Sequence, residues 1–272
     1  VKQSEINVQL EFTPKRKTIG YGVERREVDS PYSRVFVNYS SGFKGLIDSD
    51  FDYQKLQLYY RQPLIIGAIG RSNFTMELGK TFGQIPLGLM SVVPGNQTYF
   101  IINNTFSNLN FYEFVTDEYA TFQWEHNFNG KIFSRIPYLR KLNLREIIGL
   151  RGVYGTISDE NRAINASGLN YIAPEKPYWE YSAGIGNIFK VFRIDCAWRA
   201  NYRNLPDTNN FTIKGEPPTI LIKSSVSKGE FANPVVGIST PWFNNNCNEY
   251  NLSLDCVIAE ELFNAKTFNA SN

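Results

Sequence analysis

The sequence predicts an all-β fold, an antiparallel up-and-down transmembrane β-barrel of roughly ten to twelve strands. Apolar and polar residues alternate in segments of about ten residues, which places them on opposite faces of a strand. Aromatic residues make up 15% of the chain, with 20 Phe and 16 Tyr, and these residue types favour strands. Helical periodicity is nearly absent.

The strand prediction is clearest between residues 191 and 203. One face carries Phe192, Ile194, Cys196, Trp198, Ala200 and Tyr202, and the other carries Arg193, Asp195, Arg199, Asn201 and Arg203. A strand of this length spans about the hydrocarbon thickness of a bilayer. Strict alternation also marks residues 5–12, 119–128 and 178–186, and weaker alternation marks 17–28, 33–41, 51–61, 65–80, 97–114 and 144–155.

The alternating pattern ends near Gly215, and this sets the predicted organisation of the chain. Pro217 and Pro218 interrupt the strand pattern, and the residues that follow are rich in Asn and Ser. We therefore expect part of a transmembrane barrel in residues 1–215 and a divergent C-terminal tail in residues 216–272. A disulfide between Cys247 and Cys256 stays an open alternative in this tail.

Alternation also occurs in soluble β-sandwiches, so the choice of a membrane barrel depends on what each face carries. Large aromatic residues near strand ends predict an interfacial girdle on the outer face, formed by Trp124, Tyr178, Trp179, Trp198 and Tyr202. Charges of both signs share the opposite face, which suits a water-filled lumen and is costly in an apolar core. They predict a lumen network of Arg145, Arg151, Glu180, Arg193, Asp195 and Arg199.

Several classes of function are disfavoured. With 28 basic and 26 acidic residues, the chain lacks the basic surplus that nucleic-acid binding needs. Its spacing of Cys and His predicts no metal site, and Asp48, Asp50 and Asp52 resemble only the start of a calcium loop. His126 is the single histidine, lies among aromatic residues and has no G-x-S-x-G motif beside it. We expect no catalytic residues, no cofactor and no enzyme.

Six motifs carry a resemblance to a known family: GKTFGQIP (79–86), GNQT (95–98), YEFVTDEY (112–119), WEHNFNG (124–130), RIPYLRKLNLRE (135–146) and GIGNIF (184–189). Together they resemble the C-terminal domain of Bacteroidetes outer-membrane proteins that carry an N-terminal carboxypeptidase-regulatory-like domain. The resemblance covers residues 5–215 and implies the C-terminal part of a larger barrel, distantly similar to surface-antigen and Omp85-type barrels. It implies no activity, because the function of that domain is unknown. A family member would also be expected to end with one more strand after Gly215.

The expected function is that of a non-enzymatic barrel in the bacterial outer membrane, with a role in envelope biogenesis or in the passage of proteins or solutes. Its expected partners are outer-membrane lipid and other envelope proteins, and not nucleic acid. Two alternatives stay open: a fragment of a TonB-dependent-type transporter or porin, and a soluble secreted β-domain that binds glycans or proteins.

Overall fold

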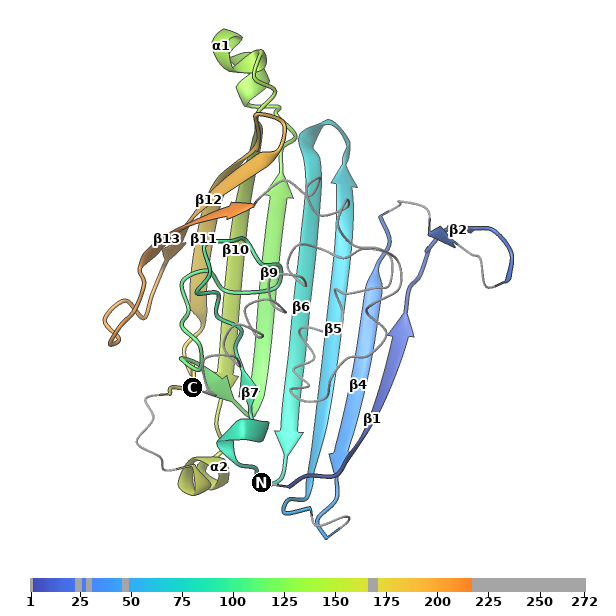
Figure 1. The fold of residues 1–272 in the computed structure, drawn as a ribbon, viewed down its shortest axis with the longest axis vertical. Coiled ribbons are helices and arrows are strands. Elements are labelled where there is room, and N and C mark those ends of the chain that lie inside the picture. Colours follow the sequence, from blue (N-terminus) through green and yellow to red (C-terminus); the bar gives the residue numbers. More distant parts are fainter. Residues whose placement is uncertain (1, 23–25, 28–30, 46–48, 166–170, 217–272) are drawn as a thin grey trace, which may run out of the picture.

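The computed structural model describes residues 2–22, 26–27, 31–45, 49–165 and 171–216. Within these ranges the chain forms one large antiparallel sheet (Figure 1). Its nine strands, in spatial order, are β1 (Glu5–Phe12), β4 (Arg34–Gly42), β5 (Tyr53–Ile66), β6 (Gly70–Phe82), β9 (Glu118–Asn127), β10 (Arg145–Thr156), β11 (Tyr178–Ile188), β12 (Phe192–Arg199) and β13 (Phe211–Glu216).

The sheet is a meander, because each strand pairs with the next of these nine strands along the chain. The strands β5 and β6 are the longest, with 14 and 13 residues. The two edge strands, β1 and β13, do not pair with each other in the described part of the chain. The predicted all-β antiparallel fold is therefore confirmed, while a closed barrel is not present among these residues.

The remaining elements are short: β2 (Thr18–Ile19), β3 (Arg26–Glu27), η3 (Gly67–Ile69), η4 (Leu87–Leu89), β7 (Ser91–Val92), β8 (Val115–Thr116), η5 (Phe133–Arg135), α1 (Pro137–Arg140) and α2 (Asp159–Ile164). None of the described helices has the length and apolar character needed to cross a membrane. The turn at η3 requires glycine at its end, since Gly70 has φ 130° and an added Cβ would lie 2.0 Å from the carbonyl oxygen of Asn127.

The two faces of the sheet differ sharply. On one face, which we call the outer face, large apolar residues from neighbouring strands lie side by side, because the registers align Leu58 with Leu78 and Tyr181 with Trp198. Many of them are exposed: Leu56, Leu58, Tyr60, Met76, Tyr154, Trp179, Tyr181, Ile185, Phe192, Ile194, Phe211 and Ile213. The opposite face, which we call the inner face, carries polar and charged residues such as Gln57, Glu77, Glu180 and Arg199.

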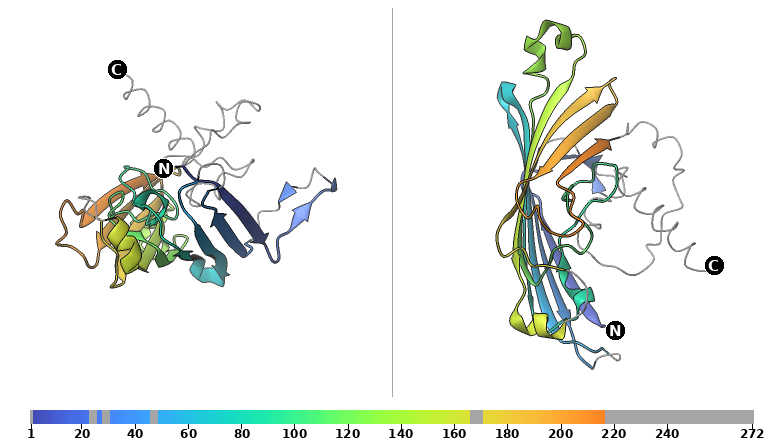
Figure 2. Two further views of the ribbon diagram at one scale, coloured as in Figure 1. Left: turned by 90° about the horizontal axis from the view of Figure 1, so that it is seen from below. Right: turned by 90° about the vertical axis from the view of Figure 1, so that its left-hand side faces the viewer.

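Residues 83–117, the connection between β6 and β9, fold back along the inner face, and we call them the inner segment. Figure 2 shows that the inner segment lies to one side of the sheet. Phe106 and Phe114 of the inner segment are fully buried, and they pack with Val153 of β10 and Tyr178 of β11. A second cluster joins Ile85, Met90 and Val115 of the segment to Tyr53, Ile157 and Ala173. The hydrophobic core therefore lies between the inner segment and the sheet.

Two of the predicted strands are wrong. Residues 97–114 form an irregular part of the inner segment, since only Phe106, Leu109 and Phe114 enter the core, and the backbone turns at Asn104 and Tyr112, which have φ of 57° and 58°. Among the described residues of the range 17–28, the strands are the two-residue β2 and β3. As a result the main sheet has nine described strands rather than ten to twelve. The predicted tail lies outside the described residues apart from Glu216, which ends β13, and so do Asp48, Cys247 and Cys256.

Candidate functional site: buried charges that hold the inner segment

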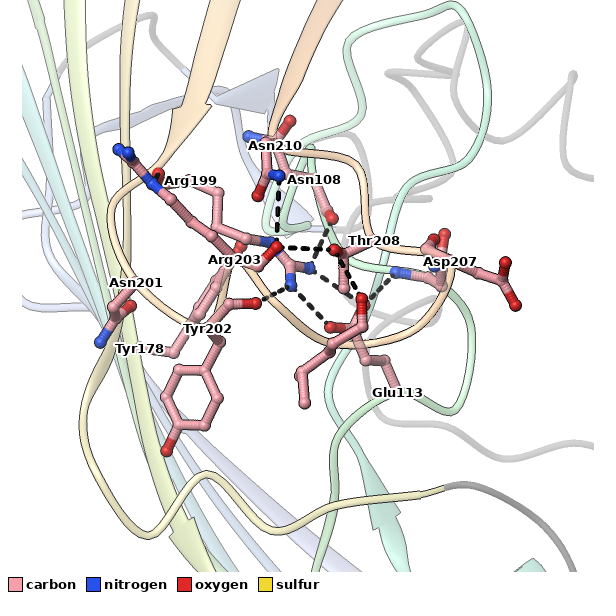
Figure 3. Close-up of polar contacts among 12 residues, drawn as sticks. Asn108, Glu113, Tyr178, Arg199, Asn201, Tyr202, Arg203, Asp207, Thr208 and Asn210 are labelled. Atoms are coloured by element: carbon pink, nitrogen blue, oxygen red, sulfur yellow. Dashed lines mark hydrogen bonds and ion pairs between the residues drawn. The ribbon is translucent and has the colours of Figure 1, made fainter.

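Arg199, at the end of β12, makes the most extensive contacts with the inner segment. Its side chain is completely buried, and its two terminal nitrogens donate to the two carboxylate oxygens of Glu113 at 2.8 and 3.0 Å (Figure 3). It also donates to the backbone oxygens of Asn108 and Tyr202, and its guanidinium lies 5.1 Å from the ring centre of Tyr178. A planar, bidentate arrangement of this kind is the strongest form of ion pair that arginine makes.

Glu180 of β11 holds the neighbouring stretch of the inner segment. Its carboxylate accepts hydrogen bonds from the backbone N–H groups of Ser107 and Asn108, both at 2.9 Å, and from the hydroxyl of Tyr178 at 2.7 Å. The side chain is almost completely buried. A buried carboxylate needs such donors, because leaving it without partners would cost several kcal/mol, roughly the penalty of an uncompensated buried ion.

Two further cations of the sheet complete this set. Arg151 of β10 donates to the hydroxyl of Ser107 at 2.9 Å. Lys214 of β13 is buried and donates to the backbone oxygen of Asn96 at 2.8 Å and to that of Thr98. We call Arg151, Glu180, Arg199 and Lys214 the clamp, because each binds the inner segment from a different strand. Three of its four members belong to the predicted lumen network.

Arg193 and Asp195 form a separate cluster near the other end of β12. Arg193 binds Asp195 at 2.6 and 2.8 Å and Glu125 of β9 at 2.6 Å, and it lies 3.9 Å from Glu216. Gly184 makes this packing possible, since an added Cβ would lie 2.0 Å from Oδ1 of Asp195. These partners all lie on strands of the sheet, so this cluster ties strands together and does not hold the inner segment.

Arg145 is not part of either cluster. It is exposed at the start of β10, where it lines an open cleft of about 210 Å³ together with Lys190 and Arg193. The prediction of one network of six residues is therefore wrong: the structure divides it into the clamp, the Arg193–Asp195 cluster and the separate Arg145. The clamp and the Arg193–Asp195 cluster lie at different levels along β12, whereas Arg145 lies at the same end of the sheet as Arg193 without forming an ion pair with that cluster.

The predicted aromatic girdle is also divided. Trp124, Trp179 and Trp198 lie on the outer face, with Trp198 packed between Tyr181 and Phe211 at ring distances of 5.5 and 5.4 Å.

The prediction that Tyr178 and Tyr202 belong to the girdle is wrong. Tyr178 is buried on the inner face, because consecutive residues of a strand face opposite sides and Trp179 faces outward. Tyr202 follows the end of β12 with φ 56°, and its ring packs against Phe114 and Tyr178. Both rings therefore support the clamp.

His126 pairs with Ser72 on the outer face. The Ser72 hydroxyl lies 2.6 Å from Nδ1 of the histidine, and both side chains are buried. The histidine ring contacts Trp124 and Phe128, so the pair is closed to solvent. No group of three or more acidic, Cys or His residues in the described part of the chain has the geometry to hold a metal ion. Asp50 instead accepts a hydrogen bond from the backbone N–H of Lys2.

Sequence reasoning missed the partners that the inner segment supplies. Glu113, Ser107 and Asn108 lie in the stretch predicted as a strand, far along the chain from the residues that bind them. Glu125 and Lys214 carried a usable signal, since both lie on the charged face of an alternating strand.

A comparison with known protein families bears out the prediction of a C-terminal domain of unknown function. Residues 2–160 match the model described as the C-terminal domain of a family of unknown function (DUF5686). A comparison with curated proteins finds no match. The matched range includes the strands from β1 to β10 and the whole inner segment. The chain therefore belongs to the DUF5686 family of unknown function, and it carries the C-terminal domain of that family.

Proposed function

We propose that this chain forms part of the wall of an outer-membrane β-barrel that serves the passage of solutes or polypeptides, with the inner segment lying in the lumen as a constriction. One observation carries the proposal. The outer face of the sheet is apolar along its whole width, while the inner face uses buried charges to hold a segment of the same chain.

The outer face supports a membrane location. Exposed apolar area costs about 25 cal/mol per Å² in water, and contiguous apolar patches of this kind are rare on soluble monomers. The long strands also have suitable lengths, since β10 and β11 contain 12 and 11 residues and a tilted transmembrane strand needs about 9–11. Lipid is thus the partner that fits this face.

The inner segment supports a role in passage. It connects two neighbouring strands and is attached by hydrogen bonds, by the Arg199–Glu113 ion pair and by apolar packing rather than by a β-ladder along its length. Loops that fold into a barrel narrow the lumen and tune its selectivity. Because the segment is a connection between strands, this arrangement favours a porin-like constriction over the separate plug of a TonB-dependent transporter. A role in envelope biogenesis is compatible with the same lumen.

Planar-bilayer conductance tests the proposal. The Glu180→Ala and Arg199→Ala substitutions remove the acceptors and donors that hold residues 107–113. We expect both to raise the unit conductance or the open probability of the reconstituted protein. The control is Arg162→Ala, which breaks an exposed ion pair with Glu175 on the connection after β10 and should leave conductance unchanged. The absence of conductance in the wild type and in both clamp variants would contradict a passage function.

A further inference from the structure

The free edge of β13 is occupied by the inner segment. The N–H of Gly215 donates to the backbone oxygen of Tyr99 at 2.8 Å, and the N–H of Ile101 donates to the backbone oxygen of Gly215 at 2.9 Å. Phe100 and Gly215 are thereby paired as a short parallel bridge. The hydrogen-bonding groups of Gly215 point away from β12, so residues 99–101 lie where another strand would add to the sheet.

This stretch is built to stay in place. Lys214 binds the backbone oxygens of Asn96 and Thr98 immediately before it. The side chain of Asn96 then braces the turn, because it donates to the backbone oxygen of Phe100 at 2.8 Å and accepts from the N–H and hydroxyl of Thr98. Its backbone is tied to Phe106, which lies in the core. The edge contact is therefore continuous with the part of the inner segment that the clamp holds.

The other edge of the sheet differs. β1 pairs only with β4 in the described part of the chain, and all eight of its residues are exposed. Its apolar residues Ile6, Val8 and Leu10 continue the alternation of the outer face. Edge strands offer unpaired backbone groups to any other strand. In the described part of the chain, the edge of β13 pairs with the inner segment through Phe100.

We infer that the edge of β13 is an exchange site, at which residues 99–101 and the strand that closes the barrel compete for the same backbone groups of Gly215. The inference rests on the proposed barrel. A backbone N–H donates to one acceptor at a time, so a closing strand paired at Gly215 displaces residues 99–101. Closure of the wall then loosens the inner segment at Asn96 and Thr98, and opening of the wall restores the contact. The position of the inner segment is thus coupled to whether the barrel is closed at the edge of β13.

A disulfide between Phe100→Cys and Gly215→Cys tests this coupling. Paired backbones lie about 4.8 Å apart, which is within the range that a disulfide bridges. A Cβ at Gly215 has room, since its nearest neighbour would be the carbonyl oxygen of Arg193 at 3.8 Å. The background carries Cys196→Ala, Cys247→Ser and Cys256→Ser, so that only the introduced pair reacts. A matched control, Val92→Cys with Val115→Cys, links β7 to β8 within the inner segment and leaves β13 untouched.

The full protein is folded in lipid vesicles under mild oxidation, and folded barrels are separated from unfolded chains by their faster migration in unheated detergent gels. If the closing strand and residues 99–101 exclude each other, every molecule in the folded band has a reduced 100–215 cysteine pair. Oxidised molecules should migrate in the folded band only after reductant is added. The 92–115 disulfide should be found in the folded band. Folded molecules that retain the 100–215 disulfide would overturn the exchange and leave the barrel proposal intact. A wild-type protein with no folded band in lipid would overturn the barrel proposal itself.

Discussion

Arg199 and Glu113 join the wall of the sheet to the inner segment through a bidentate ion pair with nitrogen–oxygen distances of 2.8 and 3.0 Å. The Arg199 side chain has 0% exposure and that of Glu113 has 10%. The pair is surrounded by Tyr178 and by the backbone of Asn108. It is therefore a buried contact of the protein core, although both residues carry charge.

Removing one partner of this pair should destabilise the protein strongly. Arg199→Ala leaves the Glu113 carboxylate buried without its counter-charge, which costs about 3–5 kcal/mol. The free energy of unfolding, measured by denaturant titration in detergent, should fall by that amount. In the control, Arg162→Ala, the lost ion pair has exposures of 55% and 61%, and such surface pairs contribute only about 0–1 kcal/mol. Equal losses in the two variants would contradict the buried role of Arg199.

Glu180→Gln should loosen the inner segment without changing the size of the side chain. A Gln side chain has one acceptor oxygen, so its amide group faces a backbone N–H of Ser107 or Asn108 that it cannot satisfy. We expect chymotrypsin to cleave faster after the aromatic residues of the segment, as followed by mass spectrometry. The matched control variant, Glu160→Gln, lies at an exposed position of α2. It should leave the cleavage rate at the wild-type value. An unchanged rate in Glu180→Gln would mean that other contacts hold the segment.

The Gly184→Ala substitution tests the Arg193–Asp195 cluster. The added methyl group would lie 2.0 Å from Oδ1 of Asp195, so the carboxylate must move away from Arg193. Overpacking of this kind costs about 1–3 kcal/mol, and thermal unfolding should report it. Gly215→Ala is the control, since its Cβ meets no atom closer than 3.8 Å. Unfolding of both alanine variants at the wild-type temperature would contradict the packing of Gly184 against Asp195.

A charge on the outer face should be costly only if that face contacts lipid. Leu58 lies near the middle of β5 on the outer face, and Gln54 lies on the same face near the end of the strand. In a bilayer, Leu58→Arg should cost about 2–4 kcal/mol and Gln54→Arg at most about 1, because the penalty falls toward the interface. Folding free energies in lipid vesicles measure both. If both substitutions change the folding free energy by no more than about 0.5 kcal/mol, as ordinary surface substitutions in water do, the outer face does not contact lipid.

The long strands were predictable because their signal is local. Alternation along β12 or β9 depends only on neighbouring residues, and it gave the correct faces for Arg193, Glu180 and Trp198. The inner segment was not predictable in this way. Phe106 and Phe114 resemble strand residues in sequence, yet they are buried by packing against Tyr178 and Val153, far along the chain.

The candidate site was predictable on one side only. The wall residues Arg151, Glu180 and Arg199 could be found from the charged faces of their strands. Their partners depend on how residues 83–117 fold back over the sheet, which no local pattern specifies. Tyr178 was within reach of the local pattern, because consecutive residues of a strand face opposite sides and Tyr178 therefore shares the inner face with Glu180.

Quenching of tryptophan fluorescence by brominated lipid tests the central claim most directly. The three described tryptophans, Trp124, Trp179 and Trp198, all lie on the outer face. In a Trp242→Phe background, vesicles of brominated lipid should strongly quench their emission. A variant that also replaces these three with Phe and carries Gln123→Trp, on the inner face of β9, should be quenched much less. Weak quenching of the outer-face tryptophans, equal to that of the residue at 123, would contradict a lipid-facing wall.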